Sequence, residues 1–249
     1  MSPGSGAAAR GDRFAGVPRP AVPPPAPGPA VALAPAVTVL RLGAAVLEVT
    51  VPRVALRIGA ADAARRGPAA VEGADVLVAD LTGIDAPDEG VELVRALGPA
   101  APVVVTGAGM AVVEAALAAG AAGVLVDGDV PADDVVAAAG TGAALLVVGC
   151  SDAAGGRQEA LARAAAALDP GPLLVEAAAA PADGPGLALL VVDPGAGAPP
   201  GEPDLVRARR VGAITRGVVA GGRLVLTDDL HLARRTVEVL GALLTAEER

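Results

Sequence analysis

The feature that most constrains the fold of this chain is a regular alternation of short apolar runs with longer Ala-rich stretches. The short runs are continuous in their apolar character, which is typical of strands buried on both faces of a parallel sheet. The Ala-rich stretches between them have the length and composition of helices. Strands and helices in such alternation predict an α/β protein.

We predict strands at Ala44–Thr50, Asp75–Asp80, Val103–Thr106, Gly123–Asp127, Ala144–Gly149, Leu173–Glu176, Leu187–Val192 and Arg223–Thr227. Helices are expected at Ala60–Glu72, Gly90–Leu97, Met110–Ala119, Ala132–Ala139, Gly156–Leu168, Asp204–Val219 and Asp229–Leu244. This number of strands favours a TIM-type (β/α)8 barrel. The link between the sixth and seventh strands is too short for a full helix, so we expect the barrel to be incomplete there. A doubly wound open sheet is the alternative architecture.

The composition restricts the chemistry of any site. The chain has no Lys, no Asn and a single His, His231, so a Lys base, an Asn metal ligand and a His metal cluster within one chain are excluded. The net charge of −9 argues against a nucleic-acid partner. The most apolar early stretch contains Arg41 and Glu48, and the N-terminus lacks a signal-peptide pattern. We therefore expect no membrane partner and a cytoplasmic protein.

The first part of the chain differs from the rest. Residues 1–36 are rich in Pro, Ala and Gly, with consecutive prolines at Pro23, Pro24 and Pro25. Such a composition cannot bury enough apolar surface to offset the entropy of ordering. We predict a disordered tail over 1–36 and a barrel domain over 37–249, with a Pro-rich docking peptide as the alternative reading of the tail.

Four stretches, in order, resemble dihydropteroate synthase. The run AVLEVTVPRV is similar to the family's first-strand motif G-V-x-N-V-T-P-D-S-F, and EGADVLVADLTG resembles E-G-A-D-I-I-D-V-G-G-E-S. PVVVTGAGMAVVEAALAAGA resembles P-V-S-V-D-T with its helix, and GGRLVLTDDLHLARRTVEVLGAL resembles the closing strand, R-V-H-D-V and the last helix. The resemblance implies a pterin-binding barrel that joins a pterin pyrophosphate to p-aminobenzoate, with Mg²⁺ and loss of pyrophosphate.

An alignment without gaps carries the family's site residues onto this chain, and most of them are replaced. Its metal-ligating Asn falls on Glu48, while its substrate-binding positions fall on or near Asp80, Thr106, Asp127, Asp193 and Asp229. The His that ends the fifth strand falls on Gly149, and the Arg and His of the last strand fall on Leu226 and Asp228. The groups that would stabilise the leaving pyrophosphate are therefore largely missing.

The family's D-P-G loop after the sixth strand has two matches. VVDPGAGAPP preserves Asp193, Pro194 and Gly195. Alternatively, LDPGPLLVEAAAA leads into the sixth strand and the Asp becomes Glu176. We prefer the second register because it gives a complete set of strands.

These observations predict a pseudoenzyme: a non-catalytic or regulatory homologue linked to folate biosynthesis. The partners implied are a pterin-like small molecule and either a second copy, as a homodimer, or a true dihydropteroate synthase. The alternative is a divergent active transferase that condenses a pterin pyrophosphate with p-aminobenzoate and uses Mg²⁺.

Several charged residues near the strand ends also have a purely structural interpretation. Asp228 and Asp229 open the last helix and are expected to cap it. We expect an acidic rim that binds pyrophosphate weakly. The arginines of the penultimate helix are expected to point into solvent: Arg207, Arg209, Arg210 and Arg216.

Overall fold

The structure is a computed structural model that describes residues 39–66, 71–107, 109–126, 138, 143–148, 173–176, 188–192 and 203–247. The predicted tail and its boundary at residue 36 lie outside these residues, and so do most of the helices expected at Ala132–Ala139 and Gly156–Leu168. The division into tail and barrel stays a prediction.

Eight parallel strands form a closed barrel in the order β10-β3-β4-β5-β6-β7-β8-β9. Their bounds are β3 Arg53–Gly59, β4 Val76–Asp80, β5 Val103–Thr106, β6 Gly123–Val126, β7 Ala144–Val147, β8 Leu173–Glu176, β9 Ala188–Val192 and β10 Gly222–Thr227. The sheet closes because β10 pairs with both β3 and β9. The predicted α/β class is confirmed, and the closed order excludes an open doubly wound sheet. β8 and β9 are the sixth and seventh strands, in agreement with the preferred register.

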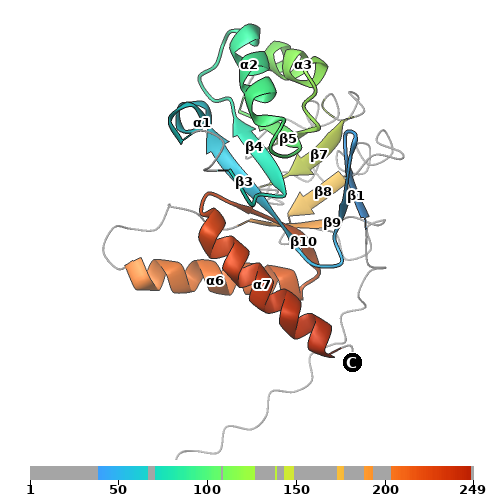
Figure 1. The fold of residues 1–249 in the computed structure, drawn as a ribbon, viewed down its shortest axis with the longest axis vertical. Helices are drawn as coiled ribbons and strands as arrows, with labels where there is room; N and C mark the ends of the chain where they lie inside the picture. The colour runs from blue at the N-terminus through green and yellow to red at the C-terminus, as the bar shows by residue number, and fades with distance from the viewer. Residues whose placement is uncertain are drawn as a thin grey trace, which may run out of the picture. The chain divides into compact units, whose positions relative to one another are not determined.

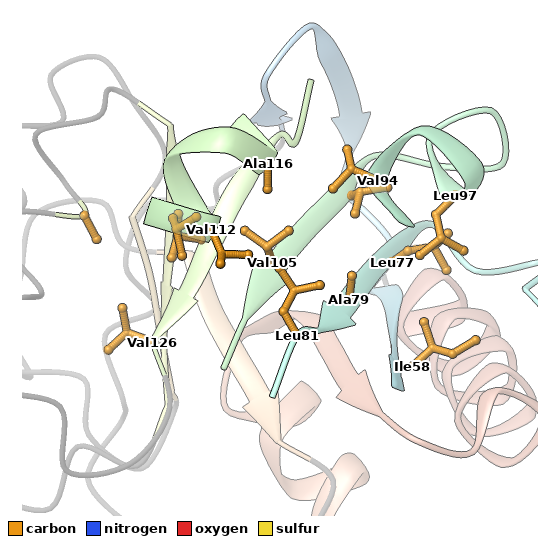
Figure 2. Close-up of a cluster of buried hydrophobic side chains, with 14 of the residues drawn as sticks. Ile58, Leu77, Ala79, Leu81, Val94, Leu97, Val105, Val112, Ala116 and Val126 are labelled. Atoms are coloured by element: carbon orange, nitrogen blue, oxygen red, sulfur yellow. The ribbon is translucent and has the colours of Figure 1, made fainter. Parts of the chain in front are cut away.

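Alternate side chains of the barrel strands belong to two different apolar layers. One layer contains Val76, Val78 and Leu226 and includes no helical residue, so it is the interior of the barrel. The other contains Leu77, Ala79 and side chains of the helices, so it lies outside the sheet. Figure 2 shows this outer layer, in which strand side chains face residues of the covering helices. Small aliphatic residues fill both layers in a chain without Trp or Tyr.

The described helices are α1 Ala60–Arg66, α2 Pro87–Leu97, α3 Met110–Ala118, α6 Pro203–Val219 and α7 Leu230–Glu247. Figure 1 shows α2 and α3 beside each other next to β4 and β5, and α6 beside α7. Each begins within three residues of its predicted start. Among the described helices, none has the length and apolar character needed to cross a membrane.

The prediction for the first barrel strand was wrong. Ala44–Thr50 does not enter the barrel: β1 Val39–Leu42 and β2 Ala45–Glu48 form a separate antiparallel hairpin, and the first barrel strand is β3. The hairpin closes the amino end of the barrel, because Leu40 and Leu42 are 1% exposed and pack in the interior layer. The hairpin turn lies against the start of β6, since a Cβ on Gly43 would come within 3.3 Å of the Ala122 Cα.

Candidate active site

The carboxyl ends of the barrel strands bring polar side chains together at one mouth, the end that carries ligand sites in barrels of this type. Arg57 lies two residues after Ala55 of the interior layer and therefore points inward. Asp80 has the same relation to Val78, and the register pairs Asp80 with Thr106 on the neighbouring strand. Thr106 is 2% exposed. Three adjacent strands thus place a guanidinium, a carboxylate and a hydroxyl on the inner face.

Arg57 and Asp80 form an ion pair across β3 and β4. The Arg57 Nε and Nη2 atoms both donate to Asp80 Oδ2, at 3.1 Å and 2.9 Å. The other oxygen, Oδ1, accepts from the backbone N–H of Thr82 at 3.0 Å and from its hydroxyl at 2.6 Å. Both oxygens of the carboxylate are therefore engaged by groups of the barrel itself.

Gly107 makes room for this arrangement. Its φ of 76° lies in the left-handed region that side chains disfavour. A Cβ at this position would lie 2.3 Å from the Thr82 hydroxyl and 2.7 Å from Asp80 Oδ1. A glycine directly after β5 is thus required both by the backbone and by the closeness of the Asp80–Thr82 pair.

The environment keeps Asp80 ionised. Burial alone would raise the pKa of this carboxyl, but the hydrogen bonds from Thr82 and the hydrogen bond and charge of Arg57 outweigh it, so the pKa lies below its ordinary value of 3.8. At neutral pH Asp80 is a carboxylate, which can only accept hydrogen bonds.

A second arginine reaches the mouth from α6. Arg210, with a side chain 10% exposed, pairs with Asp228 just after β10 and lies 3.4 Å from the Thr227 hydroxyl. The expectation that this arginine points into solvent was wrong. Arg207, Arg209 and Arg216 are exposed, as expected.

Asp229 acts as a helix cap. Its Oδ1 accepts the backbone N–H of Leu232 at 3.0 Å, and its own N–H donates to the Thr227 hydroxyl at 3.0 Å. This is the N-cap geometry that satisfies an otherwise unpaired helical N–H. The capping role predicted for Asp229 is confirmed, while a role in substrate binding stays a prediction.

A groove of about 540 Å³ runs between the ends of β3 and β10. Its apolar wall is formed by Leu56, Ile58 and Leu230, and its polar groups are Arg57, Asp62, Arg210, Asp228, Asp229 and His231. The groove is lined by both cationic and anionic side chains, and the two arginines in it each have a carboxylate partner within the protein.

The predicted site residues have different outcomes. Asp80 and Thr106 come together at the mouth, and Asp229 lies at its edge. Asp127 and Asp193 lie outside the described residues. Glu48 is exposed on β2 in the hairpin, so its assignment to a barrel strand end was wrong. The gapless alignment had placed a hairpin residue where a barrel strand belongs.

The Mg²⁺ that the resemblance implies does not fit the groups seen at this mouth. Across the described ranges, no three His, Cys, Asp or Glu side chains gather where they could hold a metal ion. Asp80, the carboxylate at the end of β4, already accepts four hydrogen bonds from Arg57 and Thr82. The described residues of the mouth therefore do not form a Mg²⁺ site.

Sequence reasoning missed Arg57 altogether. A signal was present: Arg57 interrupts the apolar run Val54–Ile58, and a charged residue inside such a run needs a partner. Asp80 was singled out, but nothing in the sequence indicated that these two residues meet.

Comparison with solved structures matches this barrel to dihydropteroate synthases. The Xanthomonas albilineans enzyme, solved with indole-2-carboxylic acid and 6-chloroguanine, superposes with a TM-score of 0.64 at 19% identity, over 83% of this chain and 98% of that one. The chain has the fold of dihydropteroate synthase. The Yersinia pestis synthase with a pterine-sulfa conjugate gives a TM-score of 0.63 at 16% identity, over 83% of this chain and 99% of that one.

The Thermus thermophilus synthase in complex with 4-aminobenzoate gives a TM-score of 0.61 at 21% identity, over 82% of this chain and 99% of that one. No protein-family model and no curated protein matches the sequence. The likeness to the synthases thus covers nearly their whole length and concerns the fold, whereas the side chains at the mouth have to be judged by their own chemistry.

Proposed function

We propose that this protein is a non-catalytic barrel with the dihydropteroate synthase fold, which binds a pterin-like molecule or a protein partner in a regulatory role linked to folate biosynthesis. The observation that carries the proposal is that each of the two arginines described at the mouth is paired with a carboxylate. Arg57 is neutralised by Asp80 and Arg210 by Asp228.

Synthase chemistry needs uncompensated positive charge. Pyrophosphate leaves with several negative charges, and fixed positive groups that stabilise them are usually a large part of catalysis. In the groove, Asp62, Asp228 and Asp229 stand beside Arg57 and Arg210, and Asp80 holds one of these arginines from the inner side. Among the described residues of the mouth the carboxylates outnumber the guanidinium groups, so this arrangement repels a leaving pyrophosphate.

The partners follow from the fold by analogy alone. The solved synthases carry 4-aminobenzoate or a pterine-sulfa conjugate. We propose a pterin-like ligand for this chain on the same fold, and a second copy or a true synthase as its protein partner. A cytoplasmic location belongs to the same proposal.

A divergent transferase is the second candidate, and one observation favours it. Asp80 and Thr106 lie side by side on the inner face of adjacent strands, at positions that the resemblance assigns to substrate binding. A carboxylate and a hydroxyl in this place suit the polar edge of a pterin.

A synthase assay distinguishes the two candidates. Purified protein supplied with dihydropterin pyrophosphate, p-aminobenzoate and Mg²⁺ should form no dihydropteroate above the uncatalysed background, while an active synthase assayed in parallel turns over. Turnover that is lost in Asp80→Asn would establish the transferase and end the proposal of a non-catalytic barrel.

A further inference from the structure

The guanidinium group of Arg57 contacts the Asp80 carboxylate in the way that a bound ligand would. Arg57 reaches Asp80 from an inward position, and both side chains stay partly accessible at the mouth, at 34% and 22% exposure. Two N–H groups on neighbouring nitrogens of one planar group converge on Oδ2. A small planar molecule with the same two donors would make the same contact with this oxygen.

The two oxygens of Asp80 have separate tasks. Thr82 holds Oδ1 through its backbone N–H and its hydroxyl, and Gly107 packs closely on that side. This fixes the orientation of the carboxylate independently of Arg57. Oδ2 is the oxygen that Arg57 engages, so a ligand that binds Oδ2 has to replace Arg57.

We propose that Asp80 is the anchor of a ligand site and that Arg57 is its built-in occupant. The ligand class is a planar group with N–H donors on adjacent nitrogens, as in guanidinium ions and in the 2-amino-4-oxopyrimidine edge of pterins and guanine. This proposal rests on the proposed function, because it names the contact through which such a barrel would hold a pterin-like molecule. In the wild-type protein, the Arg57 guanidinium occupies the position at Asp80 that such a ligand would take.

The surroundings provide room for the exchange. The groove of about 540 Å³ borders Arg57 directly. A side chain that leaves Asp80 can therefore swing toward Asp62 or Asp228, which line the same groove. Removing the guanidinium leaves Oδ2 without the two hydrogen bonds that Arg57 donates to it, which favours a ligand that restores them.

The test is a gain of binding on removal of Arg57. Arg57→Ala and the wild type are titrated by calorimetry with methylguanidinium, 6-hydroxymethylpterin and guanosine, with the thermal midpoint as a second readout. We expect the variant to bind methylguanidinium and at least one heterocycle about tenfold or more tighter than the wild type, because each ligand regains hydrogen bonds to Oδ2. The two heterocycles distinguish a pterin from a purine ligand.

Matched variants separate this effect from general loosening. Arg53→Ala removes another arginine of the same strand, which lies 3.5 Å from Asp75 at the opposite end of the barrel, and should bring no gain. Arg57→Ala combined with Asp80→Asn should lose the gain. If Arg57→Ala does not fold, Arg57→Met takes its place, since it keeps the aliphatic stem and vacates only the head.

A folded Arg57 variant that binds none of the three probes better than the wild type overturns the proposal, and so does an equal gain in Arg53→Ala. Either result leaves the synthase assay of the wild type unaffected. Turnover in that assay would contradict the proposed function, but it would not contradict the proposal that a ligand can replace Arg57 at Asp80.

Discussion

Leu42→Ala should lower the free energy of unfolding by about 2–5 kcal/mol, the usual cost of truncating a buried leucine. Leu42 is 1% exposed and belongs to the same buried cluster as Leu146 and Leu226 of the barrel interior, although it lies in the hairpin outside the barrel sheet. Truncation leaves a cavity at the amino end of the barrel, where small aliphatic neighbours cannot move far enough to fill it. Equilibrium unfolding in urea measures the loss.

The control lies on the same hairpin. Val46 is 57% exposed, so Val46→Ala removes a side chain that faces solvent and should change stability by less than about 0.5 kcal/mol. Equal effects of the two substitutions would mean that the hairpin does not close the amino end of the barrel, and that another segment covers the interior there.

Gly217→Ala should destabilise the protein by about 1–3 kcal/mol, although alanine is the better helix former. A Cβ on Gly217 would lie 2.5 Å and 2.6 Å from the two γ-methyl groups of Val191. Helix α6 therefore rests on β9 at this glycine, and the added methyl group has to push helix and strand apart. Thermal and urea unfolding both report the change.

Two further variants make this prediction specific. Gly212→Ala on the same helix meets only the Arg216 Nη1 atom at 3.5 Å, so it should stabilise the protein by up to about 1 kcal/mol. In a Val191→Ala background the cost of Gly217→Ala should disappear, with a coupling energy of about 1–3 kcal/mol. A Gly217→Ala protein as stable as Gly212→Ala would show that α6 does not contact β9 in this way.

The barrel strands could be predicted from the sequence because each is buried on both faces. Val103–Thr106 and Leu173–Glu176 were predicted with the observed bounds, and five other barrel strands differ by one or two residues, whereas β3 Arg53–Gly59 was not predicted. Continuous apolar runs between helices carry this information locally. The exception is the hairpin, where Val39 and Arg41 are exposed while Leu40 and Leu42 are buried. This alternation was present in the sequence, but it does not reveal which strand is the partner.

The two ion pairs at the mouth were harder to predict. The pair of Arg57 and Asp80 depends on the register between β3 and β4, which local patterns do not specify. The position of Arg210 had a readable signal, since Arg210, Ile214 and Val218 recur every four residues and form the buried face of α6. An arginine at the start of an apolar stripe points toward the core. Its carboxylate partner, Asp228, directly follows a predicted strand, but nothing in the sequence indicated that α6 and this strand end meet.

The central claim is that the arginine charge at the mouth is already compensated, and titration with pyrophosphate tests it most directly. Calorimetry of the wild-type protein, with and without Mg²⁺, should show binding weaker than about 1 mM, because the carboxylates at the mouth oppose a highly charged anion. Submicromolar binding of pyrophosphate in the absence of metal would contradict the account. It would show that positively charged groups at the mouth are free to hold the anion.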